Sequence, residues 1–277
     1  MSKADIIFKE NMKDILENGF WDTDYDVRPV WADDGKKAHT VKKFCITNRY
    51  DLSEEFPILT LRKTNFKAAI DEIFWIWQKK SNNVNDLNSK IWDAWADETG
   101  SIGAAYGYQL GIKHKYKEGE FDQVDRVLFD LKNNPLSRRI MTNIYTHQDL
   151  HKMNLYPCAY SMTFNVTGNK LNAILNQRSQ DMLVANNWNV CQYAALVHMF
   201  AQVSGLEAGE LVHVIADAHI YDRHIPIVEE LLKKEPMEAP KLVIDKSIDD
   251  FYKFTVDSLK LENYNHHEFK IKIPVAV

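Results

Sequence analysis

The stretch from residue 182 to residue 206, the longest without Asp, Glu, Lys or Arg, constrains the fold of this chain more than any other feature. It is long enough to cross a membrane. A helix that faces lipid does not tolerate many polar groups, and this stretch contains six of them: Asn186, Asn187, Asn189, Gln192, His198 and Gln202. We therefore expect a helix over about residues 190–203 that is buried in a protein core.

The composition is that of an ordinary folded protein. Of the 277 residues, 45% are hydrophobic and 26% are charged, and no repeat or flexible linker divides the chain. We therefore expect one domain over residues 1–277. The N-terminal residues lack the apolar core of a secretory signal. The three cysteines lack CxxC spacing, so neither a disulfide framework nor a zinc ribbon is supported. A reducing, cytoplasmic location is the expectation.

The charge balance argues against a dedicated nucleic-acid-binding protein. The formal net charge is −5 at pH 7, and the chain contains no block of basic residues. An anionic ligand would have to be bound by individual arginines, whose planar guanidinium group matches phosphate. Only eight of the 34 basic residues are arginines. The adjacent pair Arg138 and Arg139 is therefore a candidate, although a surface position is the default for any single arginine.

Local signals predict three helices. Ser2 is an N-cap candidate for a first amphipathic helix, and Gly19 is a candidate for its C-terminal end. Residues 67–78 are apolar on nearly every side of a helix, which predicts a core helix that embeds Glu72. Residues 124–131 carry apolar side chains at helical spacing and lead to a proline that ends the helix.

Alternating patterns predict strands. Residues 161–179 alternate on both sides of a turn at 167–170, which predicts a β-hairpin. Residues 211–221 predict a strand with one small, apolar face packed against the protein. Its other face carries the polar side chains His213, Asp217, His219 and Tyr221. Strands mixed with long helices in no strict βαβ order predict an α/β domain with a mixed sheet.

Two residues are candidates for chemistry. Cys158 alone is most simply a small core residue, but it becomes a nucleophile if the charge of Arg178, one strand away in the hairpin, lowers the pKa of its thiol. Glu72 has apolar neighbours on its helix, so burial would raise its pKa into the range useful for proton transfer. A salt bridge or a solvated helix edge is the open alternative. His147 and His151 lack a third ligand, and we expect no metal.

A set of motifs in a fixed order resembles the thymidylate synthase family over essentially the whole chain. The motifs are Asp26-Val-Arg28, Phe56-Pro-Ile-Leu-Thr60, Glu72-Ile-Phe-Trp75, Ile91-Trp92-Asp93-x-Trp95, Tyr106-Gly107, Ser137-Arg138-Arg139, Pro157-Cys158, Gln177-Arg178-Ser179-x-Asp181, Trp188-Asn189-Val190, Asp217-x-His219-x-Tyr221 and Pro274-Val-Ala-Val277. The resemblance implies a mixed, largely antiparallel sheet flanked by long helices. It also implies reductive methylation of dUMP to dTMP, with 5,10-methylenetetrahydrofolate as the donor of the one-carbon unit and the hydride.

The same resemblance implies a role for each motif residue. Cys158 adds to C6 of the uracil, while Arg178 lowers the thiol pKa and binds the phosphate. Glu72 and Tyr106 organise proton transfers, and Asn189 pairs with the O4 and N3 edge of the base. The other substrate contacts fall to Arg28, Arg138, Arg139, Gln177, Ser179, Asp181, His219 and Tyr221, and the folate contacts to Trp92, Trp95, Asp181 and Val277. Because the family pattern places Arg138 and Arg139 in the partner subunit's site, a homodimer is implied.

Some segments depart from the family pattern, and two other functions stay open at this point. Ala159 stands where many relatives have histidine, and residues 185–188 read Ala-Asn-Asn-Trp where Gly-x-Pro-Phe is commoner. A pyrimidine deoxynucleotide hydroxymethylase would use water in place of hydride. A non-catalytic nucleotide- or RNA-binding regulator is the third reading, but the presence of both Cys158 and Glu72 argues against it.

Overall fold

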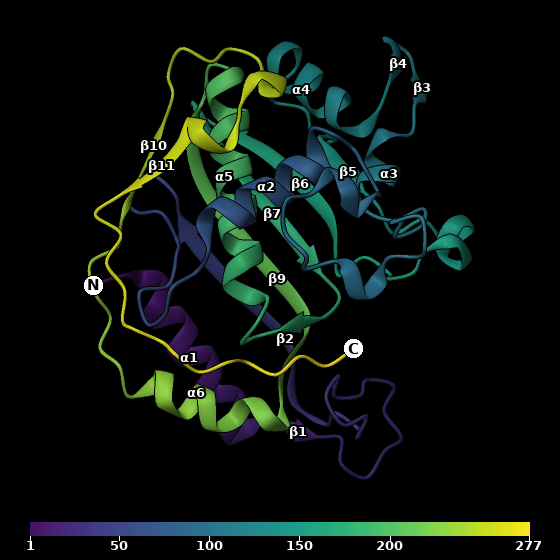
Figure 1. The fold of residues 1–277 in the computed structure, drawn as a ribbon. Coiled ribbons are helices and arrows are strands. Elements are labelled where there is room, and N and C mark those ends of the chain that lie inside the picture. Colours follow the sequence, from purple (N-terminus) through teal and green to yellow (C-terminus); the bar gives the residue numbers. More distant parts are fainter.

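A seven-stranded mixed sheet forms the centre of the computed structural model, which describes residues 1–277 (Figure 1). Its strands are β1 (Phe20–Trp21), β2 (Thr40–Asp51), β5 (Met141–Asn143), β6 (Ala159–Thr167), β7 (Lys170–Gln177), β8 (Gln180–Asp181) and β9 (Glu207–Tyr221). The order is β1-β2-β9-β7-β6-β5, with β8 against β9. β7 and β8 run parallel to β9, and all other pairs in this sheet are antiparallel. The predicted fold class is confirmed.

Two long helices cover one face of this sheet. α2 (Phe66–Trp77) and α5 (Asn186–Val203) pack against each other, and α5 also packs against β7 and β9. Their apolar side chains belong to a cluster of 47 buried residues. The buried helix that we expected in the stretch without charges is therefore confirmed. None of the helices combines the length and the apolar character required to span a bilayer.

α5 begins at Asn186, earlier than the predicted start, because its polar first residues have partners elsewhere in the chain. The amide of Asn187 donates to the carbonyl of Pro57 at 3.0 Å and accepts from the Thr64 hydroxyl at 2.8 Å. A buried amide with these bonds carries little penalty. The helix therefore starts about four residues before its predicted start, and Asn189 lies in its first turn.

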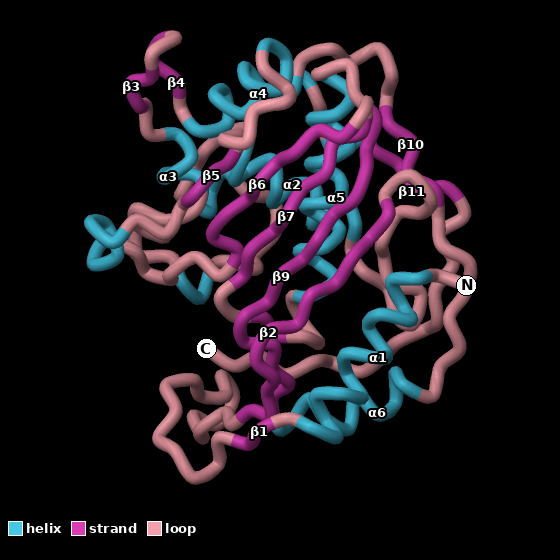
Figure 2. Tube along the Cα trace, turned by 180° about the vertical axis from the view of Figure 1, so that it is seen from behind, coloured by secondary structure: helices cyan, strands magenta, loops and turns pink.

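β9 also begins earlier than predicted, and its two faces meet different surroundings. On the face expected to be polar, His213 is fully buried next to Gln177, away from the other polar residues of the strand. On the face expected to be packed, Ala218 is fully buried but Ala216 is exposed. Ala216 is exposed because no helix covers this face of the sheet: in Figure 2, no helix lies in front of the strands β5, β6, β7 and β9.

α1 and α6 pack at the other end of the molecule. α1 (Lys3–Asn18) begins and ends as predicted, with the Ser2 hydroxyl accepting from the backbone N–H of Asp5 and Gly19 following the last turn. α6 (Ile225–Leu232) lies beside it in both views (Figures 1 and 2). Together they contribute to a second cluster of 14 buried hydrophobic residues, which includes residues of β2 and β9.

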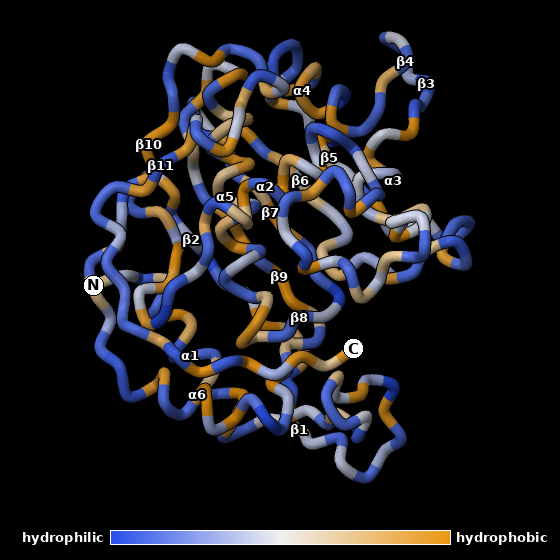
Figure 3. Tube along the Cα trace, viewed as in Figure 1, coloured by the Kyte–Doolittle hydropathy of each residue, from blue (hydrophilic) through white to orange (hydrophobic).

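Shorter elements surround this framework. They are α3 (Gly107–Gly111), α4 (Gln123–Asn133), the antiparallel pairs β3 (His114–Tyr116) with β4 (Gly119–Phe121) and β10 (Lys241–Ile244) with β11 (Leu259–Glu262), and the 3₁₀ helices η1 (Val84–Asp86), η2 (Asp93–Trp95), η3 (His147–Lys152), η4 (Asp222–His224), η5 (Phe251–Lys253) and η6 (Val256–Ser258). α4 and the β6–β7 hairpin match the predictions. Figure 3 shows that hydrophobic segments line the interior elements, whereas the outer loops are largely hydrophilic.

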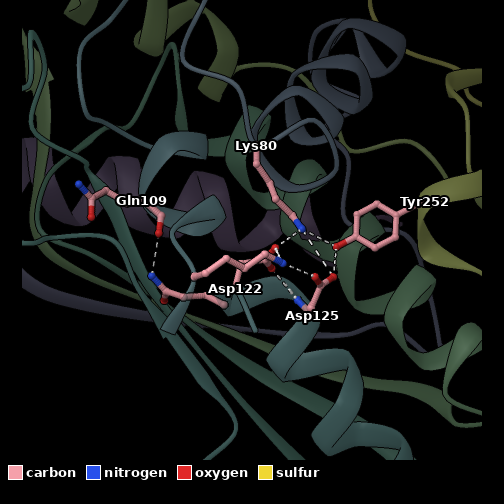
Figure 4. Close-up of polar contacts among 7 residues, drawn as sticks. Lys80, Gln109, Asp122, Asp125 and Tyr252 are labelled. Atoms are coloured by element: carbon pink, nitrogen blue, oxygen red, sulfur yellow. Dashed lines mark hydrogen bonds and ion pairs between the residues drawn. The ribbon is translucent and has the colours of Figure 1, made fainter. Parts of the chain in front are cut away.

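A polar cluster links the end of α2 to α4 and η5 (Figure 4). The ammonium group of Lys80 lies 2.7 Å from the Asp122 carboxylate and donates to the Tyr252 hydroxyl at 2.7 Å. Asp122, the N-cap of α4, is almost fully buried and accepts from the backbone N–H of Asp125. Lys113 forms a second ion pair with Asp122 at 3.0 Å. The cluster therefore holds three separate segments together.

Candidate active site

A cavity of about 720 Å³ lies at the C-terminal ends of β7 and β9. It is lined by every predicted catalytic and folate-binding residue and by all but two of the predicted substrate-binding residues. These residues are Arg28, Glu72, Trp92, Trp95, Tyr106, Cys158, Gln177, Arg178, Ser179, Asp181, Asn189, His219, Tyr221 and Val277. Because they come from distant parts of the chain, their convergence makes this cavity the candidate active site.

Cys158 stands immediately before β6, next to Arg178 at the end of β7. The Arg178 guanidinium nitrogen Nη2 lies 3.6 Å from the Cys158 sulfur. The same guanidinium group donates to the backbone carbonyls of Pro157 at 3.0 Å and Tyr156 at 2.8 Å. The hairpin pairing of β6 and β7 thus brings the cation to the thiol, and the two carbonyls hold it there.

Burial, however, dominates the acidity of this thiol. Removal from water raises the pKa of Cys158 above its ordinary value, while the charges of Arg178 and Arg28 act in the opposite direction. The prediction that Arg178 favours the thiolate has the right sign, but the net pKa shift is upward. The cause is the removal of the thiol from water, which a sequence pattern does not reveal.

Glu72 is buried on α2, and each of its carboxylate oxygens accepts a hydrogen bond from an indole. Trp92 donates to Oε1 at 3.0 Å, and Trp188 donates to Oε2 at 2.6 Å. Burial raises the pKa of Glu72 to about 7, although the two indole donors act to lower it. A carboxyl group with this pKa exchanges protons readily near neutral pH. The alternative of a salt bridge or a solvated helix edge is wrong.

Tyr106 is held in a strained backbone conformation at the edge of the cavity. Its φ of 48° and ψ of −109° are unusual for a residue with a side chain. Its hydroxyl accepts from the backbone N–H of Cys158 at 3.1 Å, and its ring packs on Trp92 at 4.9 Å between centroids. The phenol therefore contacts the nucleophile's backbone and the aromatic wall beside Glu72.

The amide of Asn189 is fixed by three glutamines. Its oxygen accepts from Gln177 and Gln180, each at 3.3 Å, and its nitrogen donates to Gln192 at 3.0 Å. Gln177 also donates to Gln180. These bonds set the plane of the amide at the cavity wall, so Asn189 offers a preorganised polar edge to a ligand.

β9 supplies polar groups on the opposite side of the cavity. The His219 ring nitrogen Nδ1 lies 2.8 Å from the Asp217 carboxylate, and the His219 and Tyr221 rings meet at 5.2 Å. Burial acts to raise the pKa of Asp217, but His219 and Lys42 hold it below the usual value. The predicted polar face of this strand is therefore real from Asp217 to Tyr221.

The C-terminal tail forms one wall of the cavity. Val277 exchanges two backbone hydrogen bonds with Val30, at 2.9 and 3.0 Å. The buried ring of His224 bonds the carbonyl of Pro274 at 2.8 Å, and Asp181 lies 3.7 Å from the other ring nitrogen. These bonds hold the tail against the loop before β2 and against η4. They explain why the chain ends in apolar residues.

Arg138 and Arg139 do not reach the cavity of their own chain. Both are exposed in the loop between α4 and β5, and neither is among the residues that line the cavity. β5 is the edge strand of the sheet, at the border of the face that no helix covers. Their predicted role therefore depends on a second copy of the chain.

Comparisons with known proteins identify the family of this chain. The model of the family described as thymidylate synthase matches residues 6–277. The chain belongs to the thymidylate synthase family. Thymidylate synthases from Bacillus subtilis subsp. natto and from Bacillus phage phi3T are each 46% identical to it over 281 residues, with 100% of both chains covered. The solved structure of thermostable thymidylate synthase A from Bacillus subtilis matches with a TM-score of 0.94 at 45% identity, covering 99% of each chain.

Three of the lining residues to which sequence reasoning assigned no role have a clear place in this thymidylate synthase site. Trp188 donates to Glu72, Gln180 donates to Asn189, and Arg62 donates to the carbonyl of Leu183 at 2.6 Å. Trp188 and Gln180 both stand inside motifs that carried the family resemblance. The signal that could have found Trp188 is a tryptophan among asparagines, since a buried indole N–H requires an acceptor. Its partner is far away in sequence and was not predictable.

Proposed function

We propose that this protein converts dUMP to dTMP by reductive methylation, with 5,10-methylenetetrahydrofolate as co-substrate. The observation that carries the proposal is the arrangement of one cavity. In it, the Cys158 sulfur lies 3.6 Å from the Arg178 guanidinium, and the Glu72 carboxylate is held between two indole N–H groups. Full-length membership of the thymidylate synthase family supports the same activity.

The polar groups of the cavity suit a pyrimidine nucleotide. Arg28 and Arg178 provide positive charge for the phosphate. Asn189 offers both an amide donor and an acceptor, which match O4 and N3–H of uracil. His219 and Tyr221 bind the ribose 3′-hydroxyl from the adjacent strand. The remaining substrate contacts belong to Gln177, Ser179 and Asp181.

The chain's own groups account for activation of the base. C5 of uracil is not nucleophilic enough for one-carbon transfer, so the Cys158 thiolate adds to C6 and converts the ring to an enolate. The electron pair moves to O4, where Asn189 donates a hydrogen bond. Glu72, with Tyr106 and ordered water, then moves protons at O4 and C5. The final loss of the thiolate from C6 restores Cys158.

The aromatic wall opposite the nucleotide fits the folate. The rings of Trp92 and Trp95 lie side by side in the cavity wall, and Val277 also lines the cavity. Flat indole surfaces suit a pteridine ring, and Asp181 is a polar partner for it. When bound, the folate supplies the one-carbon unit and the hydride. The C-terminal tail excludes water from the reacting atoms.

A homodimer completes the proposed site. On the uncovered sheet face, Met141 of β5 and Ile174 of β7 both pair with Thr163 of β6 and are exposed at 51% and 39%. Exposed apolar surface of this kind is typical of an interface between subunits. A second copy on this face brings Arg138 and Arg139 to the phosphate of the partner's site. We also propose one domain over residues 1–277 and a cytoplasmic location, where the three free cysteines stay reduced.

One assay tests this function. Purified protein is mixed with dUMP and methylenetetrahydrofolate, and dihydrofolate is followed by absorbance while dTMP is measured by chromatography. We expect equal amounts of both products. A hydroxymethylase would form a hydroxymethyl nucleotide and leave tetrahydrofolate, and a regulator would form neither. The family match favours neither alternative. Product without dihydrofolate would refute the proposal.

A further inference from the structure

The carboxylate of Glu72 has an unusual pair of partners. It lies in the core with 5% of its surface exposed and forms no ion pair. Its two oxygens instead accept from neutral indole N–H groups on different segments. Trp92 stands in the loop before η2, and Trp188 stands in the first turn of α5. The 2.6 Å contact from Trp188 is the shorter of the two.

We propose that Trp188 is a positioning residue for the reaction, whose indole N–H fixes one carboxylate oxygen of Glu72 and stabilises the ionised form of that carboxylate. This inference rests on the proposed function, because it concerns the proton transfers of the same site. Trp188 acts through Glu72 and has no chemical step of its own.

The chemistry of indole explains why this arrangement is useful. An indole N–H donates only, so it stabilises the carboxylate more than the neutral acid. It carries no charge, so it does not hold the carboxylate permanently ionised as a lysine or arginine partner would. Each carboxylate oxygen also keeps a free lone pair, which leaves it able to accept from water or substrate. Two indoles therefore fix the group while leaving it able to exchange a proton.

The other groups around Glu72 do not perform this task. Asp71, its neighbour on α2, acts to raise the pKa of Glu72, whereas Gln192 of α5 acts to lower it. The phenols of Tyr106 and Tyr193 also face Glu72, and burial raises the pKa of both. Both phenols are therefore uncharged near neutral pH. No cationic side chain bonds Glu72. The two indoles and Gln192 therefore oppose the rise in its pKa that burial causes.

The test is the pH dependence of turnover in the Trp188→Phe variant, which keeps the aromatic body and removes the donor. We expect the kcat inflection that belongs to Glu72 to move to higher pH by about one unit, since two or three N–H donors lower a carboxyl pKa by about two units. The direction is the same whether Glu72 gives or takes the proton. The inflection is assigned through its disappearance in Glu72→Gln.

Trp77→Phe is the matched control. Trp77 lies on α2, is 2% exposed, and its indole N–H makes no hydrogen bond to Glu72. This variant also removes a buried indole, but it should leave the inflection in place. In the Glu72→Gln background, Trp188→Phe should change kcat by less than about two-fold. Both substitutions remove the same interaction, so their effects on kcat are not additive.

The outcomes separate the two proposals. If the wild-type protein forms no dihydrofolate, the proposed function fails. If the wild type turns over but Trp188→Phe keeps the inflection in place, only the role of Trp188 fails. An equal loss of kcat from Trp188→Phe in both backgrounds would show a purely structural effect and would also overturn the inference.

Discussion

At the scale of single residues, the site places two ionisable groups where burial opposes their charge. Cys158 and Glu72 both have raised pKa values, and each has donors or cations that act in the opposite direction. Cys158→Ser should lower kcat by about three orders of magnitude or more, because serine is a far weaker nucleophile for conjugate addition. Titration calorimetry should show dUMP binding largely unchanged. Retained turnover would contradict the role of the thiol.

Ionisation of the buried Glu72 should also lower the free energy of unfolding above neutral pH. Its pKa is near 4.5 in an unfolded chain and about 7 in the folded protein. The folded state therefore binds more protons between these values, and this contribution to stability is lost as pH rises. The free energy of unfolding of Glu72→Gln, relative to wild type, should increase by about 2 kcal/mol from pH 5.5 to pH 8. Urea denaturation at fixed protein concentration measures it, and a difference that is independent of pH would refute it.

At the scale of elements, the polar cluster of Figure 4 holds α2, α4 and η5 together. Lys80→Met should lower the free energy of unfolding by about 2–3 kcal/mol, because it leaves the nearly buried Asp122 with only the Lys113 ion pair. Lys67→Met is the control, since Lys67 pairs with Asp257 in full solvent exposure and should contribute less than about 1 kcal/mol. Equal effects in urea denaturation would show that the cluster adds nothing.

The elements that could be predicted from sequence are those whose signals are local. α1 has its cap at Ser2, α2 is apolar on nearly all sides, and the β6–β7 hairpin has its turn at residues 167–170. The start of α5 could not be predicted, because the partners of Asn187 lie in a distant loop. The same reason applies to the site, where motif order predicted fourteen of the lining residues but not the contact of Trp188 with Glu72.

At the scale of the whole molecule, the sheet has one face packed by helices and one face left bare (Figure 2). A second copy on the bare face would make the catalytic unit larger than one chain. The exposed position of Arg138 and Arg139, outside the cavity of their own chain, makes this dependence testable. Each proposed site then takes its nucleophile from one subunit and this arginine pair from the other.

Mixed dimers provide the decisive measurement. Arg139→Ala and Cys158→Ala chains are each expected to be inactive or nearly so. After random exchange of subunits, half of the dimers are mixed and each has one intact site, so activity should recover to about a quarter of wild type. Arg28→Ala mixed with Cys158→Ala is the control, because both residues line the cavity of the same chain and no mixed dimer then contains an intact site. Recovery in both mixtures, or in neither, would rule out a site shared in this way.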